Sequence, residues 1–124
     1  MSNHRVVRAR ATTLPTSSGD RDFTATFAAP GLSHAFMVLG DQDRPFLSYR
    51  VKPNGEGPVR VTFTLNGEQV VDQTLQDPLS RTFNEVFELD ILEDEGNELR
   101  VFVPDDEPGS ATISNIIVFY TAFD

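Results

Sequence analysis

The chain has 124 residues, of which ten are Lys or Arg and nineteen are Asp or Glu, and its formal net charge at pH 7 is -9. This length fits one domain around one core, and a chain with 39% hydrophobic residues and ten Phe is expected to fold. The absence of Cys excludes disulfide scaffolds and thiolate zinc sites, and the acidic balance disfavours nucleic-acid and anionic-membrane partners.

The N-terminal residues 1–20 are predicted to form an arm or an edge strand of the single domain 1–124. Arg5, Arg8 and Arg10 lie here among the apolar residues Val6, Val7 and Ala9. A basic patch for nucleic acid is one interpretation, but an edge strand protected by charge, or an arm docked on a neighbouring subunit, suits an acidic body better.

The rest of the chain consists of short segments rich in Val, Ile, Thr, Phe and Tyr between Gly and Pro, a pattern typical of strands joined by turns. The predicted strands are residues 4–14, 22–29, 33–40, 45–52, 58–65, 68–75, 81–91, 98–103 and 111–122. We expect these nine candidates to give about eight strands. The sequence therefore predicts an all-β fold, a two-sheet antiparallel β-sandwich of the jelly-roll type.

The most specific local signal is Asn66-Gly67, which separates two alternating segments. Asn-Gly supplies the two positive φ angles of a type I′ turn and predicts a tight hairpin. We expect the apolar set to face the core: Val59, Val61, Phe63 and Leu65. We expect the polar set to face water: Arg60, Thr62 and Thr64.

Residues 83–99 are ambiguous, because their apolar positions fit both helical and strand periods. The neighbouring strands favour a strand, and a short helical turn near residues 91–95 is the alternative. Glu85 stands between Phe83 and Phe87, where a buried carboxyl would have the raised pKa that a general acid uses. A bulge or an edge position would instead expose Glu85.

The last predicted strand is apolar on both faces, which indicates a central strand whose second face is covered by a loop, a neighbour or a partner chain. One alternating set is Ile113, Ile117, Phe119 and Phe123. The other is Ile116, Val118, Tyr120 and Ala122.

The final forty residues contain a Gly-Asn turn before a strand of the type N-x-L-x-V and a last strand that reads I-S-N followed by apolar and aromatic residues. The positions concerned are Gly96, Asn97, Leu99, Val101, Ile113, Ser114, Asn115, Val118 and Tyr120. This ending resembles that of galactose-binding-like jelly rolls, a family that includes many carbohydrate-binding modules. The resemblance implies carbohydrate binding, but the chain has no Trp to stack on a sugar ring. Only Tyr49 and Tyr120 remain for that role, unless both belong to the core.

Acidic loops supply the other candidate ligands. The resemblance implies a structural calcium ion, and carboxylates are the hard oxygen ligands that calcium takes. Asp105, Asp106 and Glu107 are the preferred metal ligands, while Asp41, Asp43 and Arg44 are candidate ligand-binding residues. Residues 93–95 are a further acidic cluster. Solvated loops with no ion are the alternative.

Common catalytic motifs are absent from the sequence, and its two histidines, His4 and His34, provide no nucleophile-base pair that spacing reveals. We therefore predict a non-catalytic module with a carbohydrate or protein partner. One alternative is a self-assembling homo-oligomer of a coat, appendage or particle. A second is a small glycan-acting enzyme that uses Glu85 and a loop Asp. No apolar run suits a signal peptide or a membrane span, so we expect no membrane insertion, and a cytoplasmic location or export without a signal.

Overall fold

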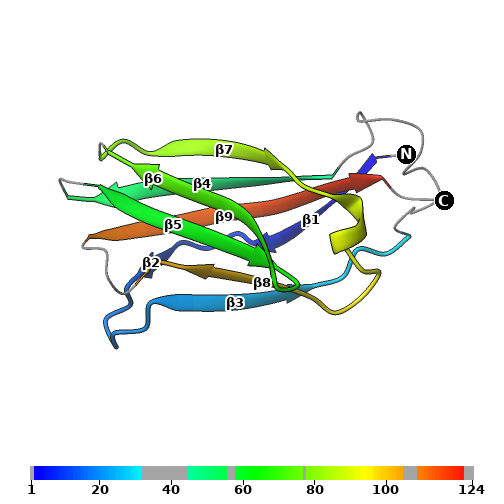
Figure 1. Ribbon diagram of the computed structural model, residues 1–124, viewed down its shortest axis with the longest axis horizontal. Helices are drawn as coiled ribbons and strands as arrows, with labels where there is room; N and C mark the ends of the chain where they lie inside the picture. The colour runs from blue at the N-terminus through cyan, green and yellow to red at the C-terminus, as the bar shows by residue number, and fades with distance from the viewer. Residues whose placement is uncertain (1, 32–44, 56–57, 77, 105–108, 122–124) are drawn as a thin grey trace.

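The computed structural model describes residues 2–31, 45–55, 58–76, 78–104 and 109–121. The predicted strand at 33–40 and the acidic candidates at 41–44 and 105–107 lie outside these residues. The described elements, in chain order, are β1 (Ser2–Arg8), β2 (Thr12–Leu14), β3 (Asp22–Phe27), β4 (Phe46–Asn54), β5 (Val59–Leu65), β6 (Glu68–Leu75), β7 (Arg81–Val86), the 3-10 helix η3 (Leu89–Ile91), β8 (Asn97–Phe102) and β9 (Ser110–Thr121) (Figure 1). No helix among them is long and apolar enough to cross a membrane.

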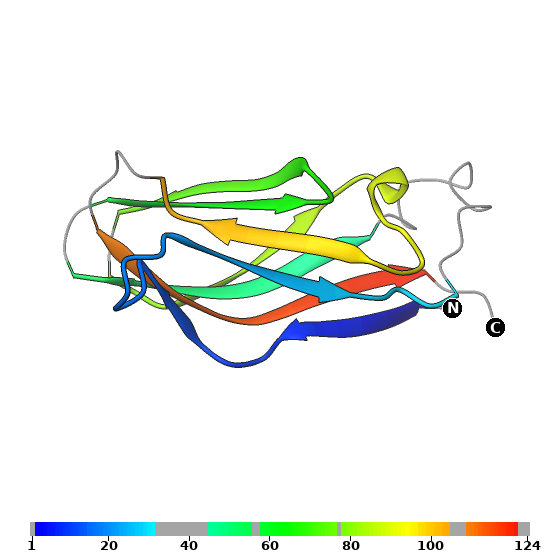
Figure 2. The same ribbon diagram turned by 90° about the horizontal axis from the view of Figure 1, so that it is seen from below.

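The strands form two antiparallel sheets that pack face to face (Figure 2). Sheet A has the order β1-β9-β4-β7, with β2 also paired to β9, and sheet B has the order β3-β8-β5-β6. The first and last strands are therefore neighbours, as Ser2↔Thr121 and Val6↔Ile117 pair across them. The predicted all-β sandwich is confirmed.

Two predicted strands differ from the observed ones. The segment 4–14 is divided into β1 and β2, so that two strands occupy one predicted strand. In the segment 81–91 the strand ends at Val86 and the 3-10 helix η3 follows at 89–91. A helical turn therefore forms, but it lies a few residues earlier than the alternative predicted near 91–95. The strand count is nine over the described residues, close to the expected eight.

The core lies between the sheets and is almost wholly aliphatic and aromatic. At its centre the rings of Tyr49 and Phe63 lie 4.5 Å apart, so that β4 of sheet A packs on β5 of sheet B. Fully burying a side chain such as Leu, Ile or Phe contributes about 1.5–3 kcal/mol. Burial of the apolar side chains therefore fixes which face of each strand points inward, and the alternate residues then point outward.

The predicted hairpin is confirmed, with φ of 51° at Asn66 and 87° at Gly67 and with Leu65 opposite Glu68. All four residues of the predicted apolar set are buried. The prediction for Thr62 was wrong, because its side chain is only 3% exposed. Thr62 lies on the outer face of a central strand, between Asp72 on β6 and Phe102 on β8, and these longer side chains flank it.

The last strand is central, as predicted, but its faces are not the two predicted sets. Asn115 has φ of 53°, and both neighbouring strands shift register beside it, which marks a bulge. The extra residue reverses the alternation, so Ile113 shares the buried face with Ile116 rather than with Ile117. The predicted sets also included Ala122 and Phe123, which lie outside the described residues.

Candidate functional site

The site that the fold positions best is the outer face of sheet A, the surface of its strands that points away from sheet B. Inward residues of β4 and β9 are buried, and the alternate residues between them are half-buried or exposed. Cross-strand pairing extends this face over β1, β2 and β7. Its described residues are His4, Val6, Thr13, Phe46, Ser48, Arg50, Lys52, Asn54, Thr82, Asn84, Val86, Ser110, Thr112, Ser114, Ile117 and Phe119.

Aromatic side chains occupy one end of this face. Phe46 of β4 is opposite Phe119 of β9, and their rings stack with centroids 4.6 Å apart and planes 13° apart. His4 of β1 adds a third ring, 5.8 Å from Phe119. Val6 and Val86, on the two flanking strands, are 55% and 58% exposed. The result is an apolar band across four neighbouring strands.

Polar side chains occupy the other end. The hydroxyls of Thr13 and Thr112 lie 2.8 Å apart, and Asn54 Nδ2 donates to Thr112 Oγ1 at 3.1 Å. Arg50 Nε donates to Ser80 Oγ at 2.7 Å. The middle of the face carries small polar residues. A surface with rings at one end and hydrogen-bonding groups at the other suits a ligand that is itself both apolar and polar.

The two tyrosines proposed as a sugar platform are in the core instead. Tyr49 is 0% exposed and packs on Phe63, and Tyr120 is 3% exposed, with its hydroxyl donating to Pro30 O at 3.1 Å. Neither ring offers a face to a ligand, so that expectation is corrected in favour of the core alternative. The physical reason is that both residues occupy inward positions of central strands of sheet A.

The acidic candidates are only partly described. Asp41, Asp43 and Arg44, and likewise Asp105, Asp106 and Glu107, lie outside the described residues, as does His34. The cluster at 93–95 is exposed. Over the described part of the chain, no group of three or more Asp, Glu, His or Cys residues is close enough to hold a metal ion.

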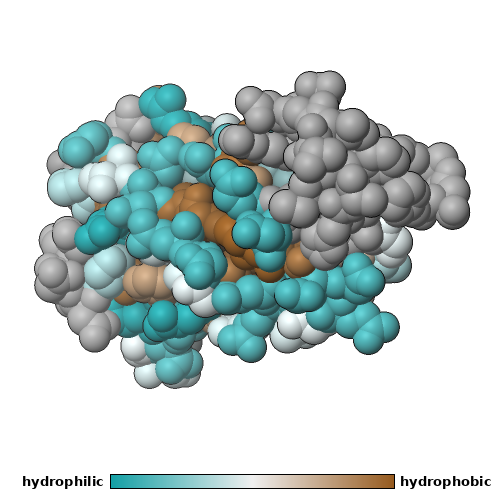
Figure 3. Space-filling model, turned by 45° about the vertical axis from the view of Figure 1, so that its right-hand side comes forward, coloured by the Kyte–Doolittle hydropathy of each residue, from teal (hydrophilic) through white to brown (hydrophobic). Residues whose placement is uncertain are grey.

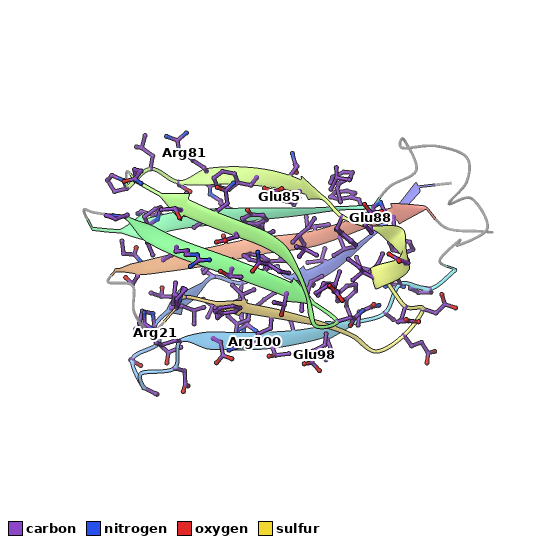
Figure 4. All side chains as sticks on the ribbon, viewed as in Figure 1. Arg21, Arg81, Glu85, Glu88, Glu98 and Arg100 are labelled. Carbon is purple, nitrogen blue, oxygen red and sulfur yellow. The ribbon has the colours of Figure 1, made fainter. Side chains whose placement is uncertain are left out.

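Glu85 faces the interior side of edge strand β7, opposite Leu47, and is half-buried. Its labelled position in Figure 4 lies between β7 and β6, at the open edge of the sandwich. Burial raises the pKa of the Tyr49 hydroxyl, and the negative charge of nearby Glu85 raises it further. A charged residue directed inward on an edge strand discourages pairing with another chain, which gives Glu85 a structural role.

An open hollow of about 490 Å³ lies beside β3 and β8, near Arg21 and Arg100 in Figure 4. Its polar groups are used within the protein. Arg100 Nε donates to Asp22 at 2.8 Å and its guanidinium lies 4.4 Å from the Phe102 ring. Arg21 donates to the carbonyl oxygens of Val103 and Pro104. The hollow therefore has few groups to offer a ligand.

A second hollow, of about 480 Å³, lies at the β5–β6 turn and around η3. Four carboxylates line it, from Glu68, Glu88, Asp90 and Glu93. The side of the molecule in Figure 3 is largely hydrophilic around one hydrophobic area. The acidic hollow would repel an anion and has no aromatic ring, which leaves the outer face of sheet A as the better candidate for a mixed ligand.

No known protein family and no curated protein matches the sequence. Solved structures match in shape. The first carbohydrate-binding module (CBM36-1) of a multidomain xylanase from the hindgut metagenome of Trinervitermes trinervoides has 12% identity and a TM-score of 0.59, over 98% of this chain and 100% of that one. A CBM36 solved with calcium and xylotriose has 8% identity and a TM-score of 0.51, over 96% and 98%.

The resemblance in fold is confirmed. At such low identity the likeness shows the fold alone, and the fold is shared more widely. Dimeric latent PorU from Porphyromonas gingivalis has 11% identity and a TM-score of 0.64, over 99% of this chain but only 13% of that one. The function of this chain therefore depends on its own surface residues.

Sequence reasoning did not select Phe46, Arg50 or Lys52. The signal was present in residues 46–52, where Leu47, Tyr49 and Val51 alternate with the residues that face outward. The period of two assigns Tyr49 to the same face as Leu47 and Val51, which is the core face and not a ligand platform. Phe119 was noted in the sequence, but only as one member of an apolar set.

Proposed function

We propose that the chain is a non-catalytic carbohydrate-binding module that holds a glycan against the outer face of sheet A. The observation that carries this proposal is the stacked pair Phe46 and Phe119 on an outward surface. Sugar rings have apolar C–H faces that pack on aromatic rings, and hydroxyl groups that bond to polar side chains. The carbohydrate-binding modules that share this fold support the class of function.

The aromatic end would provide most of the contact area. The hydroxyls of Ser48 and Ser114 and the amide of Asn84 lie next along β4, β9 and β7, with Ser48 directly opposite Asn84. These groups can donate to and accept from sugar hydroxyls. Because they lie on paired strands and not on loops, little conformational entropy is lost when a ligand binds.

Replacing the rings tests the proposal. Phe46→Ala and Phe119→Ala should each weaken binding of the best oligosaccharide from a glycan array by roughly 5- to 30-fold, which corresponds to about 1–2 kcal/mol for a lost aromatic contact. Calorimetry would measure the affinity, and circular dichroism would check that each variant folds.

The matched control is Phe102→Ala. Phe102 is also half-buried, but it lies on the outer face of sheet B under the Arg100 guanidinium. Its loss should leave sugar affinity unchanged. Equal losses from all three variants, or no binding to any glycan on the array, would exclude the outer face of sheet A as a sugar platform.

We further propose a structural calcium ion held by Asp105, Asp106 and Glu107, which lie outside the described residues. The hard oxygen chemistry of this run and the calcium in the CBM36 complex support the proposal. Calcium should raise the midpoint of thermal unfolding, and EDTA should reverse the rise. A variant with all three residues changed to their amides should lose the response. An unchanged midpoint in the unaltered chain would exclude a folding role for calcium.

Self-association through the same face is the second candidate, which the exposure of Val6 and Val86 favours. A homo-oligomer would cover the apolar band by symmetric contact. Light scattering should then give a defined oligomer, and Val6→Thr with Val86→Thr should dissociate it. A monomer at high concentration would remove this candidate and leave the face available to a glycan.

A further inference from the structure

We infer that the glycan held by the outer face of sheet A carries carboxylate groups, an inference that rests on the proposed function. The first observation is the charge of this face. Arg50 and Lys52 point outward from β4, whereas no Asp or Glu occurs among the described strand residues of the face. This face, with two cations and no anion, has the opposite charge to the chain as a whole, which has nineteen carboxylic residues and a net charge of -9.

The outer face of sheet B also carries arginines, and it serves as a comparison within the same chain. There Arg60 makes two bonds with the Asp72 carboxylate, at 2.7 and 2.9 Å, and lowers the pKa of Asp72. Arg100 pairs with Asp22 at 2.8 Å. Each described outward arginine of sheet B thus has a carboxylate of its own chain, and across the described residues no ion pair involves Arg50 or Lys52.

The second observation is the orientation of the Arg50 guanidinium. Its hydrogen bond to Ser80 uses Nε, at 2.7 Å, and within the described part of the chain no residue accepts a hydrogen bond from its terminal nitrogens. Two parallel N–H groups of a guanidinium match the two oxygens of a carboxylate. Lys52 lies two residues farther along the same face, about 7 Å by strand rise, and adds a point charge. Successive acidic sugars could contact the two cations in turn.

The position of the cations favours a polymer over a small anion. Phe46 precedes Arg50 by four residues on the same face, about 13 Å along the strand. One oligosaccharide of several rings could therefore lie on the aromatic end and reach both cations. The carboxylates of sheet B, such as Asp72, belong to a layer about 10 Å behind, a separation comparable to the screening length at 0.1 M salt. Direct contact with Arg50 and Lys52 should outweigh their repulsion.

A matched pair of ligands tests the inference on the unaltered chain. Oligogalacturonides are compared by calorimetry with the same oligomers fully methyl-esterified, which keep the sugar backbone and lose the charge. We expect the acidic form to bind at least tenfold more tightly. Equal affinity for the two forms would overturn the inference and leave the proposed function standing. Absence of binding to both forms and to every neutral oligosaccharide would overturn both.

Variants locate the effect. The double change Arg50→Gln with Lys52→Gln should weaken binding of the acidic oligomer at least tenfold and should remove most of its advantage in affinity over the ester. Arg5→Gln is the matched control, because Arg5 is an exposed arginine of the same sheet that lies opposite inward Val118. It should have little effect. An equal loss in the control, or equally tight binding of single-stranded DNA, would show nonspecific attraction of polyanions and would overturn the inference.

Discussion

The side chains of Asn66 and Asn97, 31 residues apart in the sequence, are joined by a hydrogen bond of 3.0 Å from Asn66 Nδ2 to Asn97 Oδ1. Asn66 also donates to Ile91 O, and its own oxygen accepts from Glu98 N. This pair ties the β5–β6 turn of sheet B to η3 and to the start of β8. It fixes the end of the sandwich where the chain passes from one sheet to the other.

Asn97→Ala should lower the free energy of unfolding by about 2–3 kcal/mol, since its loss leaves several partly buried groups unpaired. Asn97 is 0% exposed. Its Oδ1 accepts hydrogen bonds from Glu93 N and Asn66 Nδ2, and its Nδ2 donates to the carbonyl oxygens of Glu93 and Phe27. Urea denaturation would measure the change. The control Asn84→Ala, at an exposed strand position, should cost less than about 0.5 kcal/mol. Similar costs for the two variants would contradict the structural role of Asn97.

Tyr49→Phe should leave stability unchanged or increase it by up to about 1 kcal/mol, because the Tyr49 hydroxyl is buried with no hydrogen-bond partner in the described structure. Tyr120→Phe is the matched change. It removes the bond to Pro30 O and should cost about 1 kcal/mol. Thermal unfolding distinguishes the two variants. Destabilisation by Tyr49→Phe would mean that the hydroxyl has a partner in solution.

The Tyr49 hydroxyl also gives a dependence of stability on pH. Burial first, and the charge of Glu85 second, raise its pKa in the folded state. As pH rises, Tyr49 therefore ionises in the unfolded chain before it does so in the folded one. Its contribution to the free energy of unfolding is complete below the ordinary tyrosine pKa of about 10 and is lost as pH rises above that value. Unfolding measured from pH 8 to 11 should show a steeper loss of stability for the unaltered chain than for Tyr49→Phe. Parallel curves would contradict the shift.

The bulge at Asn115 determines which residues of β9 face outward. A β-branched residue rarely adopts its φ of 53°, so Asn115→Val should cost about 1–2 kcal/mol, whereas Asn115→Gly should be tolerated. Denaturation measures both. If Val were as stable as Gly, the positive φ would not be required for the register of β9.

The sequence was sufficient for the features that depend on local chemistry. The Asn66-Gly67 turn and the inward set of β5 follow from positive φ and a period of two, and both were predicted correctly. The division of residues 4–14 was not predicted, because β1 and β2 both pair with β9 and the interruption between them is set by this tertiary pairing.

The candidate site was largely missed, for a physical reason. Its residues come from β1, β2, β4, β7 and β9, and only sheet pairing brings Phe46 beside Phe119. Periodicity assigns a residue to a face within one strand, but does not say which strands are neighbours. The bulge at Asn115 adds a second obstacle, because a shift of one residue reverses every face after it. The shift placed Ile113 in the wrong set.

Mapping by nuclear magnetic resonance tests the central claim most directly. A 15N-labelled chain would be titrated with an acidic oligosaccharide, and amide shifts would be followed residue by residue. We predict that the largest shifts fall on Ser48, Arg50, Ile117 and Phe119, and that those of Asp22 and Phe102 on the outer face of sheet B stay small. Shifts confined to sheet B or to the loops, with β4 and β9 unchanged, would contradict the assignment of the binding surface to the outer face of sheet A.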